Sequence, residues 1–453
     1  MFEFLLVVVV VAAIGGMLLA FDSSRDVFHP IMYLAPMLLL VYAWMPFQLL
    51  REDGLERFFD KGELVHVQLL NALGVIAFVA CCVLPGLSVR RFRPGQPLAF
   101  SRRVMNRLLL ASFVLGTVGL ACWMVTIINV GGIVNAFSTA YAGGYDDSGY
   151  VRDGAMLLLV GVLLAVTVLA AKGPKLASWI AIAAFGVPWM CSAVLMGRRG
   201  PTFGFTVVVM MGWFFARGKR PPVLITAVSG LLLGWLVLFL VTNRQSIYLG
   251  SDFDVKTDVG EIVDKPQTGN EFIYGTGTVL SSERRDHYFW MRRYLAQLLV
   301  RPIPTAVWPT KYADFGVPEL LHNAGTGEGF GDTLGWEGAP GSAPGIIADL
   351  WLEVWWFAIP FMGVLGWCYG AVWRKAVLAG GPWTSIYVIL AALSIYLVMQ
   401  TMEAVIFRTL ELGVPCWLAW KWAQRPAVRR RSRRRIARRF AWNTETVEAR
   451  QHA

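Results

Sequence analysis

The stretch MFEFLLVVVVVAAIGGMLLAF, from Met1 to Phe21, is apolar along almost its whole length, and Glu3 is its only charged residue. A helix needs about 20 apolar residues to cross the hydrocarbon core of a membrane. No Lys or Arg precedes the run, so it lacks the basic start of a cleaved secretory signal peptide. We therefore predict a retained first transmembrane helix.

The rest of the chain repeats this pattern. Of 453 residues, 56% are hydrophobic and 13% aromatic, whereas a soluble domain is about 45 to 50% apolar. We predict an all-α polytopic membrane protein with about eleven transmembrane helices. The apolar runs are Phe4–Phe21, Pro30–Leu50, Leu64–Leu84, Leu108–Val130, Gly154–Ala171, Leu176–Leu195, Pro201–Ala216, Pro222–Val241, Gly345–Trp373, Trp383–Val405 and Leu410–Trp422. The seventh and eleventh runs are short, and the sequence leaves open whether they cross fully.

These runs divide the chain into four parts. Helices one to eight occupy residues 1–242, a large hydrophilic loop occupies 243–344, helices nine to eleven occupy 345–422, and a basic tail occupies 423–453. The expected loop contains an amphipathic helix and a Gly-rich segment.

Short basic loops predict the orientation, because loops rich in Lys and Arg stay in the cytoplasm. Residues 88–107 hold six arginines and no acid, and the tail after Trp422 holds ten arginines and two glutamates. If the eleven runs alternate, all basic loops fall on one side. We therefore expect a membrane protein with its N-terminus and its large loop on the outer side and its C-terminus in the cytoplasm. The tail is interpreted as a topology anchor that touches anionic lipids, not as a nucleic-acid-binding arm.

Several enzyme classes lack their motifs here. The chain has no nucleotide-binding GxxxxGK[ST], no hydrolase GxSxG and no metalloprotease HExxH. Its six cysteines lie inside apolar runs without metal-ligand spacing, which predicts neither disulfides nor a zinc site. We predict no metal and no cofactor.

The sequence GRRGP places Arg198 and Arg199 directly before the seventh run, on the expected outer side. A helix N-terminus attracts anions, and two guanidinium groups beside it can bind phosphate oxygens in pairs. We predict that both arginines bind a diphosphate; the alternative is a pair of arginines that only reach the lipid head groups.

Further basic residues cluster in the large loop. The apolar spacing from Arg284 to Val300 predicts one amphipathic helix, and the prolines after it predict an extended path. The predicted substrate-binding residues of this segment are Arg292, Arg293, Arg301 and Lys311. The alternative is a helix that merely rests on lipid.

Titratable residues follow around a Gly-rich stretch. Glu319 and His322 precede it, and Asp349 and Glu353 lie four residues apart in the ninth run, on one helical face. Ionisable groups inside a membrane span are costly and are therefore functional candidates. In the loop of residues 131–153, Tyr145 and Arg152 are residue types that bind sugars, although aromatic residues also gather at membrane interfaces.

Two stretches resemble segments of the bacterial Wzy-type oligosaccharide repeat-unit polymerases. RPIPTAVWPTKY, Arg301 to Tyr312, is similar to the family's "IPR.LWP.K" segment, and SAPGIIADLWLEVWW, Ser342 to Trp356, is similar to its "SPGIIGE.Y..FG" segment. Thr305 stands where an arginine is frequent, and Asp349 where a glutamate is frequent. The resemblance implies a GT-C-like architecture and a polyprenyl-diphosphate-linked oligosaccharide as substrate. It implies the bacterial inner membrane as location, so that the expected outer side, with the N-terminus and the large loop, is the periplasm. It also implies contact with membrane lipids and a flippase and chain-length regulator of the same pathway as partners.

The implied reaction transfers a growing glycan from its lipid diphosphate to a sugar hydroxyl of an incoming repeat unit. Arginines can stabilise the leaving diphosphate without a metal, and a general base must take the hydroxyl proton. The candidate bases, in order of preference, are His322, Asp349 and Glu319. Two alternatives stay open: a glycan ligase with a lipid-core acceptor, and a lipid-linked oligosaccharide flippase without enzymatic activity.

Overall fold

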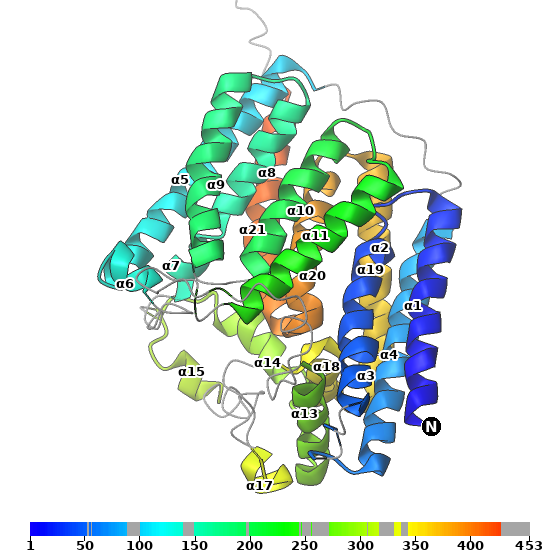
Figure 1. Cartoon of the computed structure of the whole chain (residues 1–453). Coiled ribbons are helices and arrows are strands. Elements are labelled where there is room, and N and C mark those ends of the chain that lie inside the picture. Colours follow the sequence, from blue (N-terminus) through cyan, green and yellow to red (C-terminus); the bar gives the residue numbers. More distant parts are fainter. Residues whose placement is uncertain are drawn as a thin grey trace, which may run out of the picture.

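The structure is a computed structural model, and every secondary-structure element among its described residues is helical. The described residues are 1–51, 54–55, 57–87, 100–138, 149–195, 199–243, 246, 255, 271–305, 307–316, 330–336 and 343–426. The long helices form one bundle (Figure 1). They are α1 (Phe2–Ser24), α2 (Pro30–Leu39) continued by η1 (Leu40–Trp44) and α3 (Met45–Arg51), α4 (Lys61–Leu87), α5 (Arg102–Asn129), α8 (Leu157–Ala170), α9 (Lys175–Leu195), α10 (Arg199–Ala216), α11 (Val223–Thr242), α19 (Ala358–Ala379), α20 (Pro382–Met399) and α21 (Met402–Gln424).

Shorter helices gather at one end of this bundle, which we call the loop end (Figure 1). They are α6 (Ile133–Phe137), α7 (Gly149–Gly154), α13 (Glu271–Arg285), α14 (Arg292–Leu295) continued by η2 (Ala296–Val300), α15 (Lys311–Asp314), α17 (Phe330–Leu334) and α18 (Gly345–Val354) followed by η3 (Trp355–Phe357).

Nine helical segments of the described residues are long and apolar enough to cross a membrane. They are Phe2–Ser24, Pro30–Arg51, Lys61–Leu87, Arg102–Asn129, Val151–Ala170, Lys175–Leu195, Val223–Leu240, Gly345–Ala379 and Pro382–Met399. They coincide with nine of the eleven predicted apolar runs, which supports the predicted class of a multi-pass helical membrane protein. The two remaining runs are also helical, as α10 and α21, and are long enough, but they do not meet the same requirements for hydropathy and charge.

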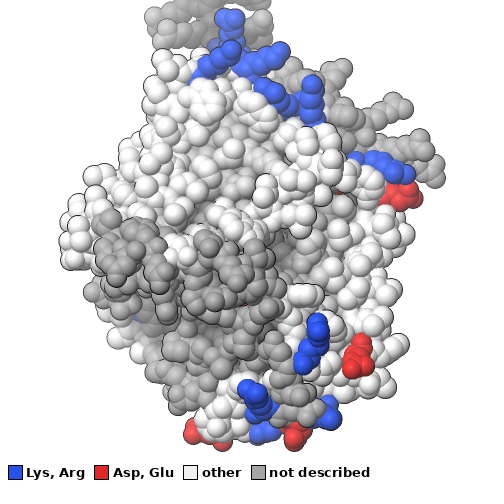
Figure 2. All heavy atoms as spheres, viewed as in Figure 1, with Lys and Arg blue, Asp and Glu red and all other residues white. Residues whose placement is uncertain are grey.

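The opposite end of the bundle carries basic residues, and we call it the basic end. Helix α5 begins there at Arg102 and α9 at Lys175, and Figure 2 shows Lys and Arg side chains gathered at that end. The Arg107 guanidinium, near the start of α5, donates hydrogen bonds to the carbonyls of Trp422 and Ala423, near the end of α21. The predicted gathering of basic loops on one side therefore agrees with the packing of the described helices.

Helices α4 and α19 pack backbone against backbone. A Cβ atom added to Gly366 would lie 2.2 Å from the Phe78 carbonyl oxygen, and one added to Gly370 would lie 2.3 Å from that of Cys82. Only glycine permits this distance, as is common where membrane helices meet. The two glycines lie four residues apart and so share one face of α19.

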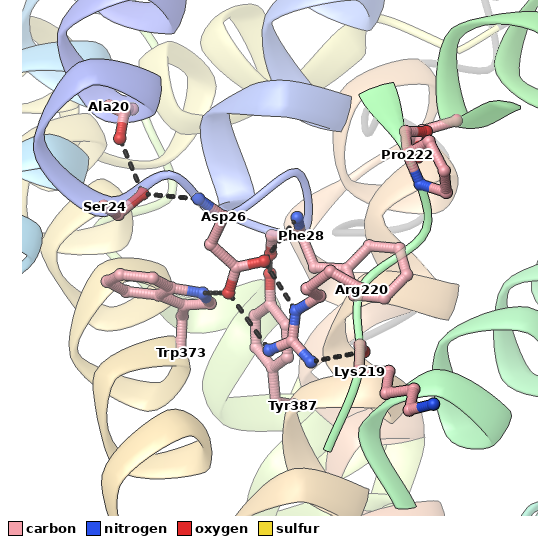
Figure 3. A network of polar contacts seen from close by, with 10 residues as sticks. Ala20, Ser24, Asp26, Phe28, Lys219, Arg220, Pro222, Trp373 and Tyr387 are labelled. Atoms are coloured by element: carbon pink, nitrogen blue, oxygen red, sulfur yellow. Dashed lines mark hydrogen bonds and ion pairs between the residues drawn. The ribbon is translucent and has the colours of Figure 1, made fainter. Parts of the chain in front are cut away.

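A buried carboxylate ties three parts of the basic end together (Figure 3). Asp26, between α1 and α2, is fully buried and accepts hydrogen bonds from Arg220 Nε at 2.6 Å and from the Trp373 indole at 3.0 Å. The Arg220 guanidinium also lies 4.0 Å from the centre of the Phe215 ring. Tyr387 of α20 donates a hydrogen bond to the Phe28 carbonyl beside this pair. The network fastens the α1–α2 connection to the α10–α11 connection.

We predict that Asp26→Ala destabilises the protein strongly. The substitution leaves the Arg220 side chain, only 10% exposed, without its carboxylate, and removal of one partner from a buried ion pair typically costs about 3–5 kcal/mol. The thermal midpoint of purified protein in detergent should fall. Asp22→Ala is the control, because Asp22 pairs with Arg25 at the surface and is 80% exposed. Equal midpoints for the two variants would contradict this role of Asp26.

A second prediction concerns pH. Burial lowers the pKa of the His29 imidazole to about 4, while the negative charge of Asp26 opposes the shift. The unfolded chain, with a histidine pKa near 6.5, takes up a proton as the pH falls from 6.5 to 4, whereas the folded protein excludes it. This contribution to stability is therefore complete above pH 6.5 and is lost as the pH falls toward 4. His29→Asn keeps a capping residue before Pro30, and its midpoint should fall less than that of wild type between pH 7 and 5. An identical pH dependence would contradict the assignment.

Candidate functional site

The ninth apolar run is not one continuous helix. It is divided at Trp355, whose φ of 54° and ψ of −137° end α18 before α19 begins. Helix α18 has ten residues and every one of them is buried, so it is about 15 Å long, half the thickness of the hydrocarbon core. Such a half-length helix leaves both of its ends inside the protein, where other groups must satisfy them.

One buried guanidinium joins both acidic residues of α18. Arg293 of α14 lies 2.7 Å from the Asp349 carboxylate through Nη2 and 2.5 Å from the Glu353 carboxylate through Nε. The three side chains are 1% exposed or less. The predicted shared face of Asp349 and Glu353 is thus confirmed, since both carboxylates contact the same side chain. The two negative charges outweigh the effect of burial and raise the pKa of Arg293.

Asp349 has further partners on two other elements. Its Oδ2 accepts hydrogen bonds from the Tyr294 hydroxyl at 2.5 Å and from the Met402 backbone N–H at 2.9 Å. Burial, with the charge of Asp349 next, raises the pKa of Tyr294 well above its ordinary value, so this phenol remains a donor. Both carboxylate oxygens of Asp349 are therefore occupied. To act as a general base Asp349 would have to give up one of these bonds, and the geometry favours a positioning role.

The charged network continues from this buried centre toward the surface. Glu403 of α21 lies 3.9 Å from Arg293 Nη1 and accepts a hydrogen bond from Gln297. Arg301 donates to Gln297 at 2.8 Å and also binds the Asp153 carboxylate. The Arg301 guanidinium lies 4.2 Å from the centre of the Phe407 ring, and its side chain is 24% exposed. Arg301 is thus a partly accessible cation at the edge of a network whose centre is buried.

Sequence reasoning missed the charged face of α21. Glu403 was placed in the tenth apolar run, predicted to extend to Val405, but α20 ends at Met399 and α21 begins at Met402. Arg408 lies between the two predicted runs, and Glu411 is the second residue of the eleventh, so α21 joins all three on one helix. The Arg408 guanidinium lies 4.4 Å from the centre of the Tyr396 ring, and Glu411 interacts electrostatically with Arg408 and Arg301. The spacing of these three ionisable residues along one apolar helix was the signal that could have revealed them.

Four predicted substrate-binding residues lie around this network. Arg199 begins α10 and lies 2.5 Å from the carboxylate of Glu271, so an acidic side chain occupies the place where a diphosphate was expected. Lys311 is buried, and its ammonium donates hydrogen bonds to the carbonyls of Val300, the last residue of η2, and of Ile303. Arg292 is exposed on α14, and Arg152 is 44% exposed beside Asp153.

The remaining predicted residues lie outside the described residues; they are Arg198, Tyr145, Glu319 and His322. Their predicted roles stay predictions. Among the described residues, no group of three or more His, Cys, Asp or Glu side chains is arranged to hold a metal ion.

The predicted amphipathic helix from Arg284 to Val300 is interrupted. Helix α13 ends at Arg285 and α14 begins at Arg292, with Asp286, Trp290 and Met291 at positive φ between them. The interruption lets the backbone N–H groups of Phe289 and Trp290 donate to the Leu352 and Glu353 carbonyls at 3.0 and 2.7 Å. The break therefore satisfies the C-terminal end of α18, which a continuous helix would leave without partners.

Comparison with known proteins finds no match among protein-family models, curated proteins or solved structures.

We predict that Arg293→Met reduces the amount of folded protein sharply. It leaves two carboxylates buried without a counter-charge, a change that typically costs about 3–5 kcal/mol. Addition of Asp349→Asn and Glu353→Gln to the same variant should restore much of the thermal stability, because the uncompensated charges are gone. Arg292→Met, next in sequence but exposed, is the control and should leave the midpoint unchanged. If Arg293→Met is as stable as Arg292→Met, the buried cluster does not organise this region.

Proposed function

We propose that the protein polymerises polyprenyl-diphosphate-linked oligosaccharide repeat units at the outer face of the bacterial inner membrane. In this proposal it is a metal-independent membrane glycosyltransferase of surface polysaccharide synthesis. Its products are a longer lipid-linked glycan and a free polyprenyl diphosphate.

One observation carries the proposal: the two stretches that resemble Wzy-type polymerases meet in a single charged network. Arg301 begins the first stretch, and Asp349 and Glu353 belong to the second. Arg293, Gln297 and Glu403 connect the two through ion pairs and hydrogen bonds. Nothing in the apolar pattern of the chain requires this contact. It supports a common role for the two stretches, which in the proposed reaction is to hold the lipid diphosphate beside the acceptor sugar.

The proposed chemistry needs positive charge at the leaving group and a base at the acceptor. The bond between the donor sugar's anomeric carbon and the diphosphate oxygen breaks, and the acceptor oxygen forms the new glycosidic bond. The acceptor's proton passes to the general base, for which His322 and Glu319 are the remaining candidates. Arg301 supplies charge to the departing diphosphate from its partly exposed position. Arg199 supplies a second cation if the phosphate displaces Glu271. The buried cluster around Arg293 serves to position these groups.

The proposal includes eleven crossings with the loop end periplasmic. Helix α10 contacts Glu271 at the loop end through Arg199, and the connection after it contacts Asp26 at the basic end through Arg220. Helix α21 contacts Gln297 at the loop end through Glu403 and the Arg107 side chain at the basic end. Helices α10 and α21, which contain the two short predicted runs, therefore extend between the two ends of the bundle, which supports crossing by both.

The test uses Arg301→Ala and Arg301→Lys in cells that make the polymer. Loss of a charge-assisted contact worth about 1.5–3 kcal/mol should lower polymer yield by about tenfold to a hundredfold, and single lipid-linked repeat units should accumulate. Lys should rescue only partly, since it lacks the planar guanidinium fork.

Arg25→Ala is the control for this experiment, because Arg25 is 56% exposed at the basic end. Its polymer yield should equal that of wild type at equal protein level in the membrane. Normal polymer from Arg301→Ala would remove the main support for the proposed reaction.

A further inference from the structure

A second group of polar and aromatic side chains lies at the loop end, beside the charged network but not within it. His66 of α4 and Glu283 of α13 face one another, with His66 Nε2 lying 2.8 Å from Glu283 Oε1. Their side chains are 36% and 30% exposed. A carboxylate on one imidazole nitrogen fixes the ring and leaves the other nitrogen for a further partner. The pair is thus an oriented hydrogen-bonding group open to solvent.

Aromatic rings surround this pair. The His66 ring centre lies 6.1 Å from that of Trp351 and 5.8 Å from that of Trp356. Tyr288, Trp290 and Trp355 lie next to these rings, and we call these three residues the aromatic platform. The Tyr288 ring centre lies 6.3 Å from Trp290 and 6.4 Å from Trp355. Trp351 lies fully buried beneath, with its ring centre 6.5 Å from that of Trp355.

The two tryptophans of the platform are exposed, and both have a strained backbone conformation. Trp290 is 58% exposed and Trp355 is 43% exposed, and their φ angles are 50° and 54°. Six non-glycine residues of the described chain have positive φ, and four of them border the platform: Asp286, Trp290, Met291 and Trp355. Large side chains in this region are strained, and such strain is retained mainly at functional sites. A helix end alone would be satisfied by glycine, which adopts this conformation freely.

The polar groups around the platform can form hydrogen bonds with the hydroxyl groups of a ligand. Burial raises the pKa of Tyr288 to about 12, and the charges of Glu283 and Asp286 add to the rise, so its hydroxyl remains a donor. Glu283 offers carboxylate oxygens, and the second nitrogen of His66 can donate or accept. Exposed aromatic faces beside a few directed polar groups are suited to a sugar ring, which has apolar C–H faces and a rim of hydroxyls.

We propose that the aromatic platform and the His66–Glu283 pair form a subsite for one pyranose ring of an oligosaccharide. The identity of that oligosaccharide as the lipid-linked repeat unit rests on the proposed function. The tryptophans stack on the ring faces, and His66 and Glu283 bind its hydroxyls. This subsite lies on the same end of the bundle as Arg301, so one substrate can contact both.

The decisive variant is Trp355→Gly. Glycine suits a φ of 54° and a ψ of −137°, so the variant relieves strain and should fold normally while lacking the ring. Purified protein in lipid nanodiscs is titrated with the free repeat-unit oligosaccharide released by mild acid from the lipid-linked pool of the producing cells. Binding is followed by saturation-transfer NMR. We expect Trp355→Gly and Glu283→Ala to bind the oligosaccharide about tenfold more weakly than wild type, or more weakly still. Trp235→Leu, which changes a 46% exposed tryptophan of α11, is the control and should bind as wild type does.

The outcomes separate this inference from the proposed function. Loss of oligosaccharide binding in Trp355→Gly supports the subsite, provided that the variant has a normal thermal midpoint and elution volume. This holds whether or not polymer is made. Binding without any polymerisation by reconstituted wild type would leave the sugar site in place and refute the polymerase. Equal binding by wild type and Trp355→Gly, or no binding by wild type, overturns the subsite and assigns the tryptophans to the lipid head groups.

Discussion

The guanidinium of Arg293, shared between Asp349 and Glu353, is the interaction on which the loop end depends. Two carboxylates on a buried helix of ten residues would be prohibitive without a counter-charge. Arg293 supplies it from a separate element, and Tyr294 and Met402 satisfy the other oxygen of Asp349. The position of α18 is therefore determined by polar contacts from α14 and α21 as much as by apolar packing.

Neighbouring elements also satisfy the backbone groups at both ends of α18. At its start, the Tyr42 hydroxyl accepts a hydrogen bond from the Ile347 backbone N–H at 3.2 Å. Tyr42 belongs to a π-helical turn of the second membrane segment, a local irregularity that is common near functional sites. At its end, the chain between α13 and α14 turns through strained residues to reach the Leu352 and Glu353 carbonyls. The irregular backbone on both sides thus satisfies the ends of a short helix inside the protein, while the large side chains at the strained positions belong to the proposed sugar subsite.

The local sequence pattern predicted where the long helices lie. It predicted neither the break in the ninth run nor which residues pair with the buried charged side chains. Apolar runs predicted the long helices, and a spacing of four placed Asp349 and Glu353 on one face. The same reasoning assigned Arg293 to substrate, because a sequence shows that an arginine is basic but not that two carboxylates bury it. The interruption between α13 and α14 was missed for a related reason: its cause is the end of α18, which lies some sixty residues later in the chain. Glu403 and Glu411 escaped notice although both lie inside predicted apolar runs, Trp383–Val405 and Leu410–Trp422, because those runs were selected for their apolar residues and did not show that the two acids share one helix.

The Asp26–Arg220 pair at the basic end has a consequence for the order of assembly. Its partners are separated by 194 residues, and α2, α4, α5, α8, α9 and α10 all lie between them in the chain. During synthesis, Asp26 is made long before the arginine that neutralises it. The α1–α2 connection therefore cannot adopt its final buried position until α10 has been inserted and has delivered Arg220 to the same side. Completion of the α1–α2 hairpin is in this way a late event of folding, although its residues precede those of the other described helices in the chain.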